Sequence, residues 1–232
     1  MIEVIYGPEW FYNSGLFIDS ISLVVLFLIG FFSIKYYNIN KSNKNYLYLG
    51  MSFFVLSVSF LSLILMNAAI YYDLLELTHG EYVTISYEAF EWADAIAYFG
   101  LLLYRLLAIF GLYFLYSIYL KQSRPVVFLV SYLILISTFF SVSAYYIFHL
   151  TSLILLTLIT LEYQRQYSRT KNSSTKMLAY SFGIIAISQV VAIFIKLHSG
   201  FYVLSQSIQL IGYILLLATF ILVLKHGKKN KN

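Results

Sequence analysis

The sequence predicts an all-α membrane protein with seven transmembrane helices, an outer N-terminus and a cytoplasmic C-terminus. Three observations lead to this fold class. Hydrophobic residues make up 61% of the 232 residues and charged residues 11%, well below the roughly one quarter that soluble domains carry. Apolar runs of the ~20 residues that a bilayer crossing needs recur along the chain. The charges in the gaps between these runs alternate in sign.

Basic residues gather in alternate gaps. They are Lys35, Lys41 and Lys44, then Lys121 and Arg124, then Arg165, Arg169, Lys171 and Lys176, and finally Lys225, Lys228, Lys229 and Lys231. One gap between them carries acids instead: Asp73, Glu76, Glu81, Glu88, Glu91 and Asp94. Because short basic loops stay in the cytoplasm during insertion, this pattern orients the chain and requires an odd number of crossings.

The apolar runs place the spans at about 16–37, 46–71, 94–120, 126–142, 143–163, 177–197 and 201–224. The fourth and fifth spans divide one long run, 126–161. As a single helix this run would measure about 54 Å, against a hydrocarbon core of ~30 Å. Arg124 and Arg165, at its two ends, must also share one side of the membrane. We therefore expect two helices joined by a tight outer turn near 141–143.

The remaining segments are short. Residues 1–15 predict an outer N-terminal segment rather than a cleaved signal peptide, because they contain Glu3 and Glu9 and no basic start. Residues 72–93 predict a long outer loop, with a turn at His79-Gly80 and Ser86 capping the helix that leads into the third span. Its acids form either a solvated face or a cation-attracting vestibule. Residues 225–232 predict a basic cytoplasmic tail with no soluble domain.

The two halves of the chain predict an internal repeat. Offsets of 130 and 104 residues align polar and aromatic side chains: Asp19 with His149, Ser22 with Ser152, Tyr98 with Tyr202, and Arg105 with Gln209. The first offset lays spans 1–2 on spans 5–6, and the second lays span 3 on span 7. This predicts a parallel 3+1+3 repeat in which span 4 links the halves. Parallel repeats occur in transporters, with the binding site where the halves meet.

Polar side chains inside the predicted spans are the candidate site residues, because such groups are costly in hydrocarbon. They are Asp19, Asn67, Asp94, Tyr98, Arg105, His149, Gln189, Gln206 and Gln209. Counted at 1.5 Å per residue, they lie at mid-depth or in the outer half, whereas the inner half is apolar. We therefore expect an outward-facing polar pocket with Arg105 at its floor.

Arg105 needs a carboxylate, amides or a bound anion as its partner, and Asp19 and Gln209 are the internal candidates. Asp94 and Tyr98 share its stripe of the third span. Two interpretations stay open, a structural interhelical network and a ligand pocket. For His149 the same choice is between a helix-packing hydrogen bond and ligand binding or proton sensing. Lys196 is expected to lie at the membrane interface.

The sequence lacks the residues that several classes of chemistry require. The chain has no cysteine, which excludes disulfides and thiolate ligands, and one in-span histidine does not supply paired haem ligands. Neither an HExxH nor a GxSxG motif occurs. We expect no catalytic residues, no metal site, no cofactor and no enzyme activity. The net charge of +5 lies in membrane-flanking loops, which indicates lipid headgroups rather than nucleic acid as partner.

The predicted 3+1+3 architecture resembles the SWEET-type sugar carriers and the microbial opsins. The spans lack the prolines of those carriers, and 201–224 lacks the retinal-binding lysine of opsins. The stretch 41–50, KSNKNYLYLG, and the serine-spaced run 51–60 are similar to the second helix of seven-helix input domains of prokaryotic histidine kinases. This resemblance implies a sensor, and the short tail implies a separate signalling partner.

These observations favour a seven-helix sensor or receptor in the cell membrane of a prokaryote with an AT-rich genome. It would bind a small-molecule ligand from the outer side and signal through a cytoplasmic partner docking at Arg165–Lys176. The alternative is a small-solute transporter of the 3+1+3 type, and a further alternative is a structural membrane subunit. The apolar inner half favours the sensor, and the repeat favours the transporter.

Overall fold

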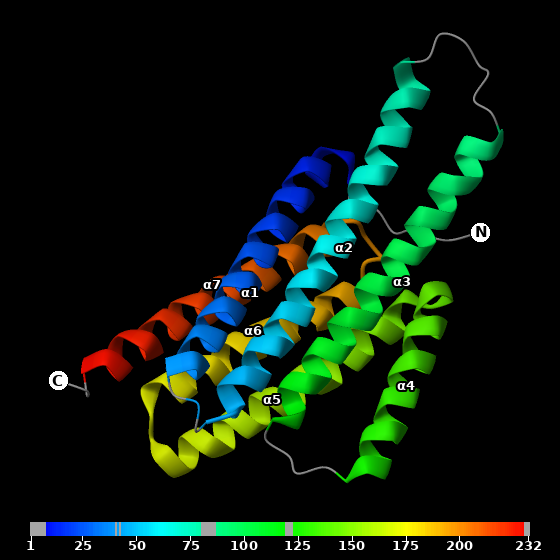
Figure 1. The fold of residues 1–232 in the computed structure, drawn as a ribbon. Coiled ribbons are helices and arrows are strands. Elements are labelled where there is room, and N and C mark those ends of the chain that lie inside the picture. Colours follow the sequence, from blue (N-terminus) through cyan, green and yellow to red (C-terminus); the bar gives the residue numbers. More distant parts are fainter. Residues whose placement is uncertain (1–7, 40, 42, 80–86, 119–122, 230–232) are drawn as a thin grey trace.

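A computed structural model describes residues 8–39, 41, 43–79, 87–118 and 123–229 of the chain. Within this part, the regular elements are all helical (Figure 1). They are η1 (Glu9–Phe11), α1 (Tyr12–Ile39), α2 (Asn45–His79), α3 (Tyr87–Ser117), α4 (Arg124–Ser143), α5 (Tyr145–Thr170), α6 (Ser173–Ile193) and α7 (Gly200–Lys229).

The prediction of seven membrane-length helices is confirmed. Among the described residues, seven helical segments are long and apolar enough to cross a membrane: Ser14–Ile39, Asn45–Ala68, Ala95–Ser117, Arg124–Ser143, Tyr145–Thr170, Ser173–Ile193 and Gly200–Leu222. Their outer faces carry large apolar side chains; Phe128 and Phe99, for example, are 76% and 66% exposed. Water-soluble monomers do not expose apolar surface on this scale, so these faces fit contact with a lipid bilayer.

The long apolar run divides into two helices, as its length and flanking charges predicted. α4 ends at Ser143 and α5 begins at Tyr145, with Ala144 between them at φ −128° and ψ 82°. Pro125 lies in the first turn of α4, where its missing N–H leaves no intrahelical bond unmade. The two helices meet at a sharp corner, so Arg124 and Arg165 lie at the same end of the bundle (Figure 1).

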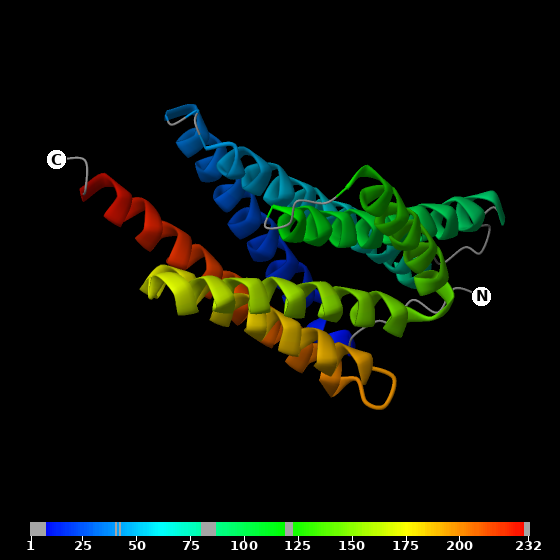
Figure 2. The ribbon, with the colours of Figure 1, turned by 90° about the horizontal axis from the view of Figure 1, so that it is seen from below.

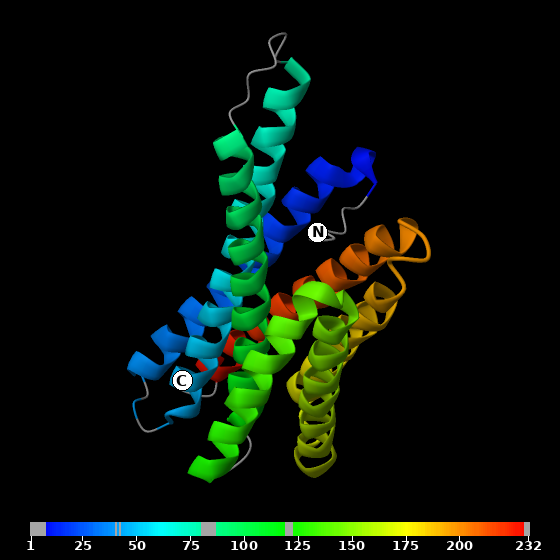
Figure 3. The same ribbon diagram turned by 90° about the vertical axis from the view of Figure 1, so that its right-hand side faces the viewer.

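The prediction of a loop over 72–93 is corrected. α2 continues to His79 and α3 begins at Tyr87, so helix replaces most of the expected loop. Gly80 of the predicted turn and the proposed cap Ser86 lie outside the described residues. Leu, Glu and Ala, which are strong helix formers, are frequent in 74–79 and 87–93. The apolar-length criterion detects only the part of a helix inside the membrane, and here the helices extend beyond the others (Figures 1 and 3).

The helices pack as two sequential triplets. α2 packs against both α1 and α3, and α6 packs against both α5 and α7. The triplets meet where α1 contacts α7 and where α3 contacts α5. α4 lies at the side of the bundle, against α3 and α5. Figure 2, seen from below, separates the two triplets clearly.

The bundle has two distinct ends. We call one the Ala144 end; it also holds the start of α1 and the connection between α6 and α7 (Figure 3). We call the other the Lys171 end; it holds the connections from α1 to α2 and from α5 to α6. Lys171 itself adopts a left-handed conformation, φ 52° and ψ 23°, which ends α5.

The buried faces of the two triplets follow the offsets of the predicted repeat. The buried residues of α5 are Phe148, Ser152, Leu156, Ile159 and Tyr163, and each follows a buried α1 residue by 130 positions: Ile18, Ser22, Leu26, Ile29 and Ser33. In α7, buried Gln209 and Leu216 follow buried Arg105 and Leu112 by 104 positions. The two offsets therefore align the faces that point into the bundle.

The main hydrophobic core fills the half of the bundle toward the Lys171 end. It includes Leu26 and Ile29 of α1, Leu115 of α3, Ile159 of α5 and Leu216 of α7, each at most 2% exposed. This core joins both triplets, and it leaves the Ala144 half free to hold polar groups.

Candidate functional site

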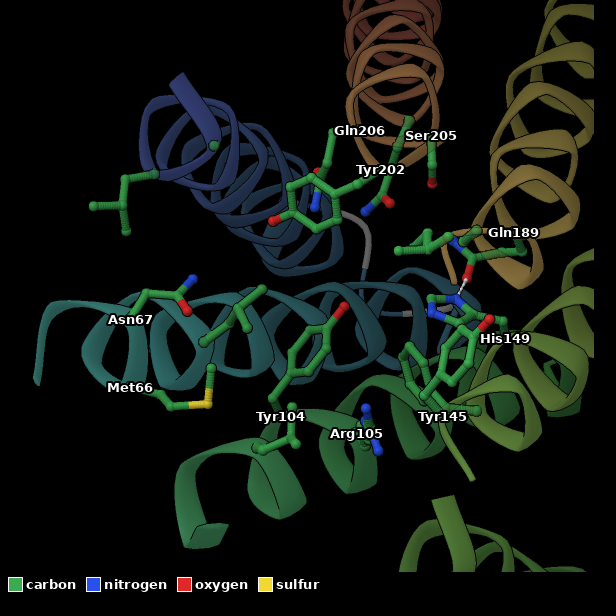
Figure 4. A pocket seen from close by; sticks show the side chains of 18 of the residues that line it. Met66, Asn67, Tyr104, Arg105, Tyr145, His149, Gln189, Tyr202, Ser205 and Gln206 are labelled. Atoms are coloured by element: carbon green, nitrogen blue, oxygen red, sulfur yellow. Dashed lines mark hydrogen bonds between the residues drawn. The ribbon is translucent and has the colours of Figure 1, made fainter. Parts of the chain in front are cut away.

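A cavity of about 140 Å³ lies between the triplets at the Ala144 end. Its lining includes residues close to helix ends: Gly15 of α1, Tyr145 of α5, Ile195 after α6 and Tyr202 of α7. Side chains from both triplets converge on it (Figure 4). The cavity has room for several water molecules or one small solute.

Six predicted site residues line this cavity together. They come from five helices: Asn67, Arg105, His149, Gln189, Gln206 and Gln209. Residues that are far apart in the sequence thus contribute one guanidinium, one imidazole and four amides to a single space. The cavity lies between the triplets, which is where the predicted repeat placed a binding site.

The other three predicted residues do not join them. Asp19 is 1% exposed and absent from the cavity lining. Tyr98 is also absent from the lining, and its ring meets Phe99 edge-on at 5.7 Å between centroids. The side chain of Asp94 lies outside the described part of the structure. Of the predicted stripe on α3, only Arg105 is shown to reach the cavity.

The carboxylate of Asp19 is buried beside the cavity without a hydrogen bond. Neither Oδ1 nor Oδ2 has a partner among the described residues. The expected pairing of Asp19 with Arg105 is therefore wrong, since the ion pair found among the described residues is that of Arg165 with Glu162, at 2.5 Å. A buried carboxylate without partners is costly, which makes Asp19 an unusual residue of α1.

Arg105 is bound to α4 instead. Its Nη1 donates to the carbonyl oxygen of Ser141 and, at 3.3 Å, to the Oγ of the same residue. The guanidinium also lies over the ring of Phe148, 5.7 Å from its centroid. The last four carbonyls of a helix have no intrahelical partner, and positive charge is favourable at that end. Arg105 therefore caps the C-terminus of α4.

The floor of the cavity is made by other residues than Arg105. Directly below it lies a second, smaller space of about 40 Å³ with a mostly apolar lining. Four residues line both spaces: Tyr104, Phe148, Gln189 and Gln209. Arg105 lines only the upper one, so it belongs to the wall. The expectation that Arg105 lies at the floor of the cavity is therefore wrong. The C-terminal end of α4 meets α3 near the middle of α3, and Arg105 binds α4 there.

One wall is held by hydrogen bonds between α5, α6 and α7. Nδ1 of His149 lies 2.9 Å from Oε1 of Gln189 (Figure 4). Oγ of Ser205 donates to the carbonyl oxygen of Ser188 at 3.0 Å. The hydroxyl of Tyr145 donates to the carbonyl oxygen of Ile193 at 2.5 Å. The helix-packing interpretation of His149 agrees with its bond to Gln189, although its ring also faces the cavity.

The part of the lining that α7 contributes keeps a free acceptor. Oε1 of Gln206 is buried and has no hydrogen-bond partner among the described residues. Gln209 makes one long bond, from Nε2 to the Tyr213 hydroxyl at 3.4 Å. Buried polar groups in proteins are nearly always satisfied by protein, water or ligand. Gln206 therefore offers a position for a hydrogen-bond donor inside the cavity.

Sequence reasoning missed several lining residues, chiefly Tyr104, Tyr145, Tyr202 and Ser205. The chain has 23 tyrosines, and tyrosines near span ends are expected at membrane interfaces. Because tyrosines are so numerous, those that line the cavity could not be told apart from interfacial ones in the sequence. One available signal was the alignment of Tyr202 with Tyr98 in the repeat.

Lys196 is exposed in the connection between α6 and α7, with its Nζ 5.5 Å from the centroid of the Tyr145 ring. This fits its predicted interfacial place. Within the described residues, no three His, Cys, Asp or Glu side chains gather to hold a metal ion.

The chain matches no family model, no curated protein and no solved structure. Fold and site together define its class: a protein of seven membrane-length helices, packed as two triplets around a polar cavity.

Proposed function

We propose that the chain is a sensor or receptor of the prokaryotic cell membrane that binds a small polar molecule in this cavity and signals through a separate partner. One observation carries the proposal. The cavity collects polar side chains from both triplets at the Ala144 end, and the main hydrophobic core closes the bundle below it. A ligand held between the triplets can change how they pack without passing through.

The proposed orientation has the Ala144 end outside the cell. Its support is the position of the basic residues. Lys35, Lys41, Arg124 and Lys171 are exposed at the connections that form the Lys171 end, and basic loops stay cytoplasmic. The segment Arg165–Lys176 at this end is the proposed docking site for the partner.

Cysteine labelling tests the orientation, because the chain has no cysteine of its own. Ser199→Cys puts one exposed thiol at the Ala144 end, and Ser173→Cys puts one at the Lys171 end. A membrane-impermeant maleimide applied to intact cells should label the first variant and not the second. Labelling of Ser173→Cys without labelling of Ser199→Cys would show that the Lys171 end lies outside the cell, which contradicts the proposed orientation.

Thermal stabilisation of the detergent-purified protein tests the pocket. A panel of sugars, amino acids and small anions should contain a compound that raises Tm. Gln206→Ala should abolish the shift, because its side chain lines the cavity. Gln164→Ala is the matched control, since Gln164 is an exposed residue of α5 near the Lys171 end. A sensor should also show ligand-dependent labelling of Ser173→Cys in inside-out vesicles.

The transporter is a second candidate, favoured by the symmetry of the packing. If α1, α2 and α3 correspond to α5, α6 and α7, the contact of α1 with α7 becomes the contact of α5 with α3, and both contacts exist. Ser59 Oγ donates to Leu56 O at 2.6 Å, and Ser188 Oγ donates to Ile185 O at 2.7 Å. These similar bonds lie 129 residues apart, one residue short of the offset of 130 that aligns α1 with α5.

Proteoliposomes distinguish the candidates. A sensor binds the stabilising compound without moving it, whereas a transporter accumulates it inside the vesicles. A panel without any stabilising compound, together with unchanged labelling of Ser173→Cys, would leave the structural subunit as the remaining interpretation.

A further inference from the structure

Resting on the proposed function, we infer that the ligand of the cavity is a small carboxylate, bound by Arg105. Arg105 is 8% exposed, lines the cavity and forms no ion pair with a described residue. Among the described residues that line the cavity there is no Asp or Glu. An arginine keeps its charge in proteins, and a buried charge without a counter-charge is costly.

The geometry of Arg105 suits a planar anion. Two hydrogen bonds hold its Nη1 to Ser141. The other edge of the guanidinium is formed by the N–H groups of Nε and Nη2. This edge of a guanidinium presents two parallel donors, which match the two oxygens of a carboxylate. Ser141 and the ring of Phe148, 5.7 Å away, hold the guanidinium in place and so act as positioning residues.

The remaining lining fits the rest of a small solute. The free Oε1 of Gln206 can accept a hydroxyl hydrogen, and the amide of Asn67 also lines the cavity. The described lining residues offer no carboxylate to receive an ammonium group. The volume of about 140 Å³ restricts the molecule to a few carbon atoms. A short hydroxycarboxylate such as lactate is therefore a suitable probe.

The experiment compares lactate with lactamide, which has the same shape and no charge. We expect lactate to raise the Tm of the purified full chain, and lactamide and equimolar sodium chloride to have no effect. Arg105→Gln should abolish the shift. Because that variant also loses the cap of α4, a second variant leaves Arg105 intact: Asn67→Asp adds a carboxylate to the cavity and should weaken lactate binding on the order of tenfold. Asn43→Asp, at the exposed Lys171 end, is its matched control and should bind normally.

Equal stabilisation by lactamide and lactate would overturn the inference, as would unchanged lactate binding by Asn67→Asp. The proposed function fails differently. If an uncharged compound raises Tm and Gln206→Ala abolishes that shift, the pocket stands and only the carboxylate is wrong. If neither lactate nor any compound of the wider panel binds, both proposals are overturned.

Discussion

Arg105 connects the cavity to the packing of the helices. The same guanidinium lines the cavity and caps the C-terminus of α4 through the carbonyl of Ser141. A hydrogen bond to a charged group contributes about 1.5–3 kcal/mol when it is buried. Arg105 therefore has a structural role that is present without any ligand, and the two interpretations of the polar residues are not exclusive.

Replacing Arg105 tests this structural role. Arg105→Gln should lower the free energy of unfolding by about 1–3 kcal/mol, because the carbonyl of Ser141 loses its charged donor. Arg105→Lys should recover part of the loss, since an ammonium group can still donate. Thermal unfolding in detergent measures both. Arg165→Gln is the control: its pair with Glu162 is largely exposed and is worth about 0–1 kcal/mol. An Arg105→Gln variant as stable as Arg165→Gln would contradict the capping role.

Asp19 gives the opposite prediction. Its carboxylate has no hydrogen-bond partner among the described residues, so Asp19→Asn removes a charge-bearing group that the fold does not satisfy. We expect this variant to be at least as stable as the natural chain, with a gain of up to about 2 kcal/mol. Ser22→Ala, one turn further along α1 and also buried, is the comparison. A lower Tm for Asp19→Asn would mean that the carboxylate stabilises the bundle.

The sequence predicted individual site residues where a polar side chain would be costly to bury in the membrane. Arg105, Gln189 and Gln209 were found because polar groups in apolar spans are expensive, and all three line the cavity. The partner of Arg105 could not be found in this way. It depends on where α4 ends against α3, and no periodicity along one helix contains that information.

At the level of the elements, length and charge were the reliable signals. They predicted the break between α4 and α5, and Ala144 confirms it. They failed for 72–93, because a helix outside the membrane needs neither an apolar run nor basic flanks. The helices of the spans and the described helical parts of 72–93 thus rest on different physical causes. Burial in hydrocarbon stabilises the first, and helix propensity favours the second.

Close approach of α1 and α2 gives a prediction for one glycine. A Cβ on Gly50 would lie 2.6 Å from Cγ1 of Ile34 and 3.1 Å from the carbonyl oxygen of Gly30. Gly50→Ala should therefore destabilise the bundle by about 1–3 kcal/mol. At Gly183 the nearest atom would be 3.7 Å away, so Gly183→Ala should be neutral or slightly stabilising. Thermal unfolding of the two variants measures the contrast. Equal Tm values would show that α1 and α2 can separate freely.

At the scale of the whole molecule, the two triplets predict that the chain tolerates division. Fragments 1–122 and 123–232, expressed together, should associate through the contacts of α1 with α7 and of α3 with α4 and α5. An affinity tag on one fragment should therefore recover the other in equal amount from detergent. Gly111→Leu offers a control inside the first triplet, since a Cβ there would lie 2.6 Å from Cγ of Leu56, and it should reduce the recovery. Fragments that never associate would contradict the two-triplet description.

The contact between α1 and α7 has a consequence for synthesis. α1 leaves the ribosome long before α7, which packs against it on that side, so the seam stays open until α7 has been made. α2 and α3 can pack beside α1 much earlier, and α5 and α6 can pair before α7 emerges. During this interval the nascent chain is a half-assembled protein with an uncovered flank, which a membrane chaperone or a quality-control protease can recognise.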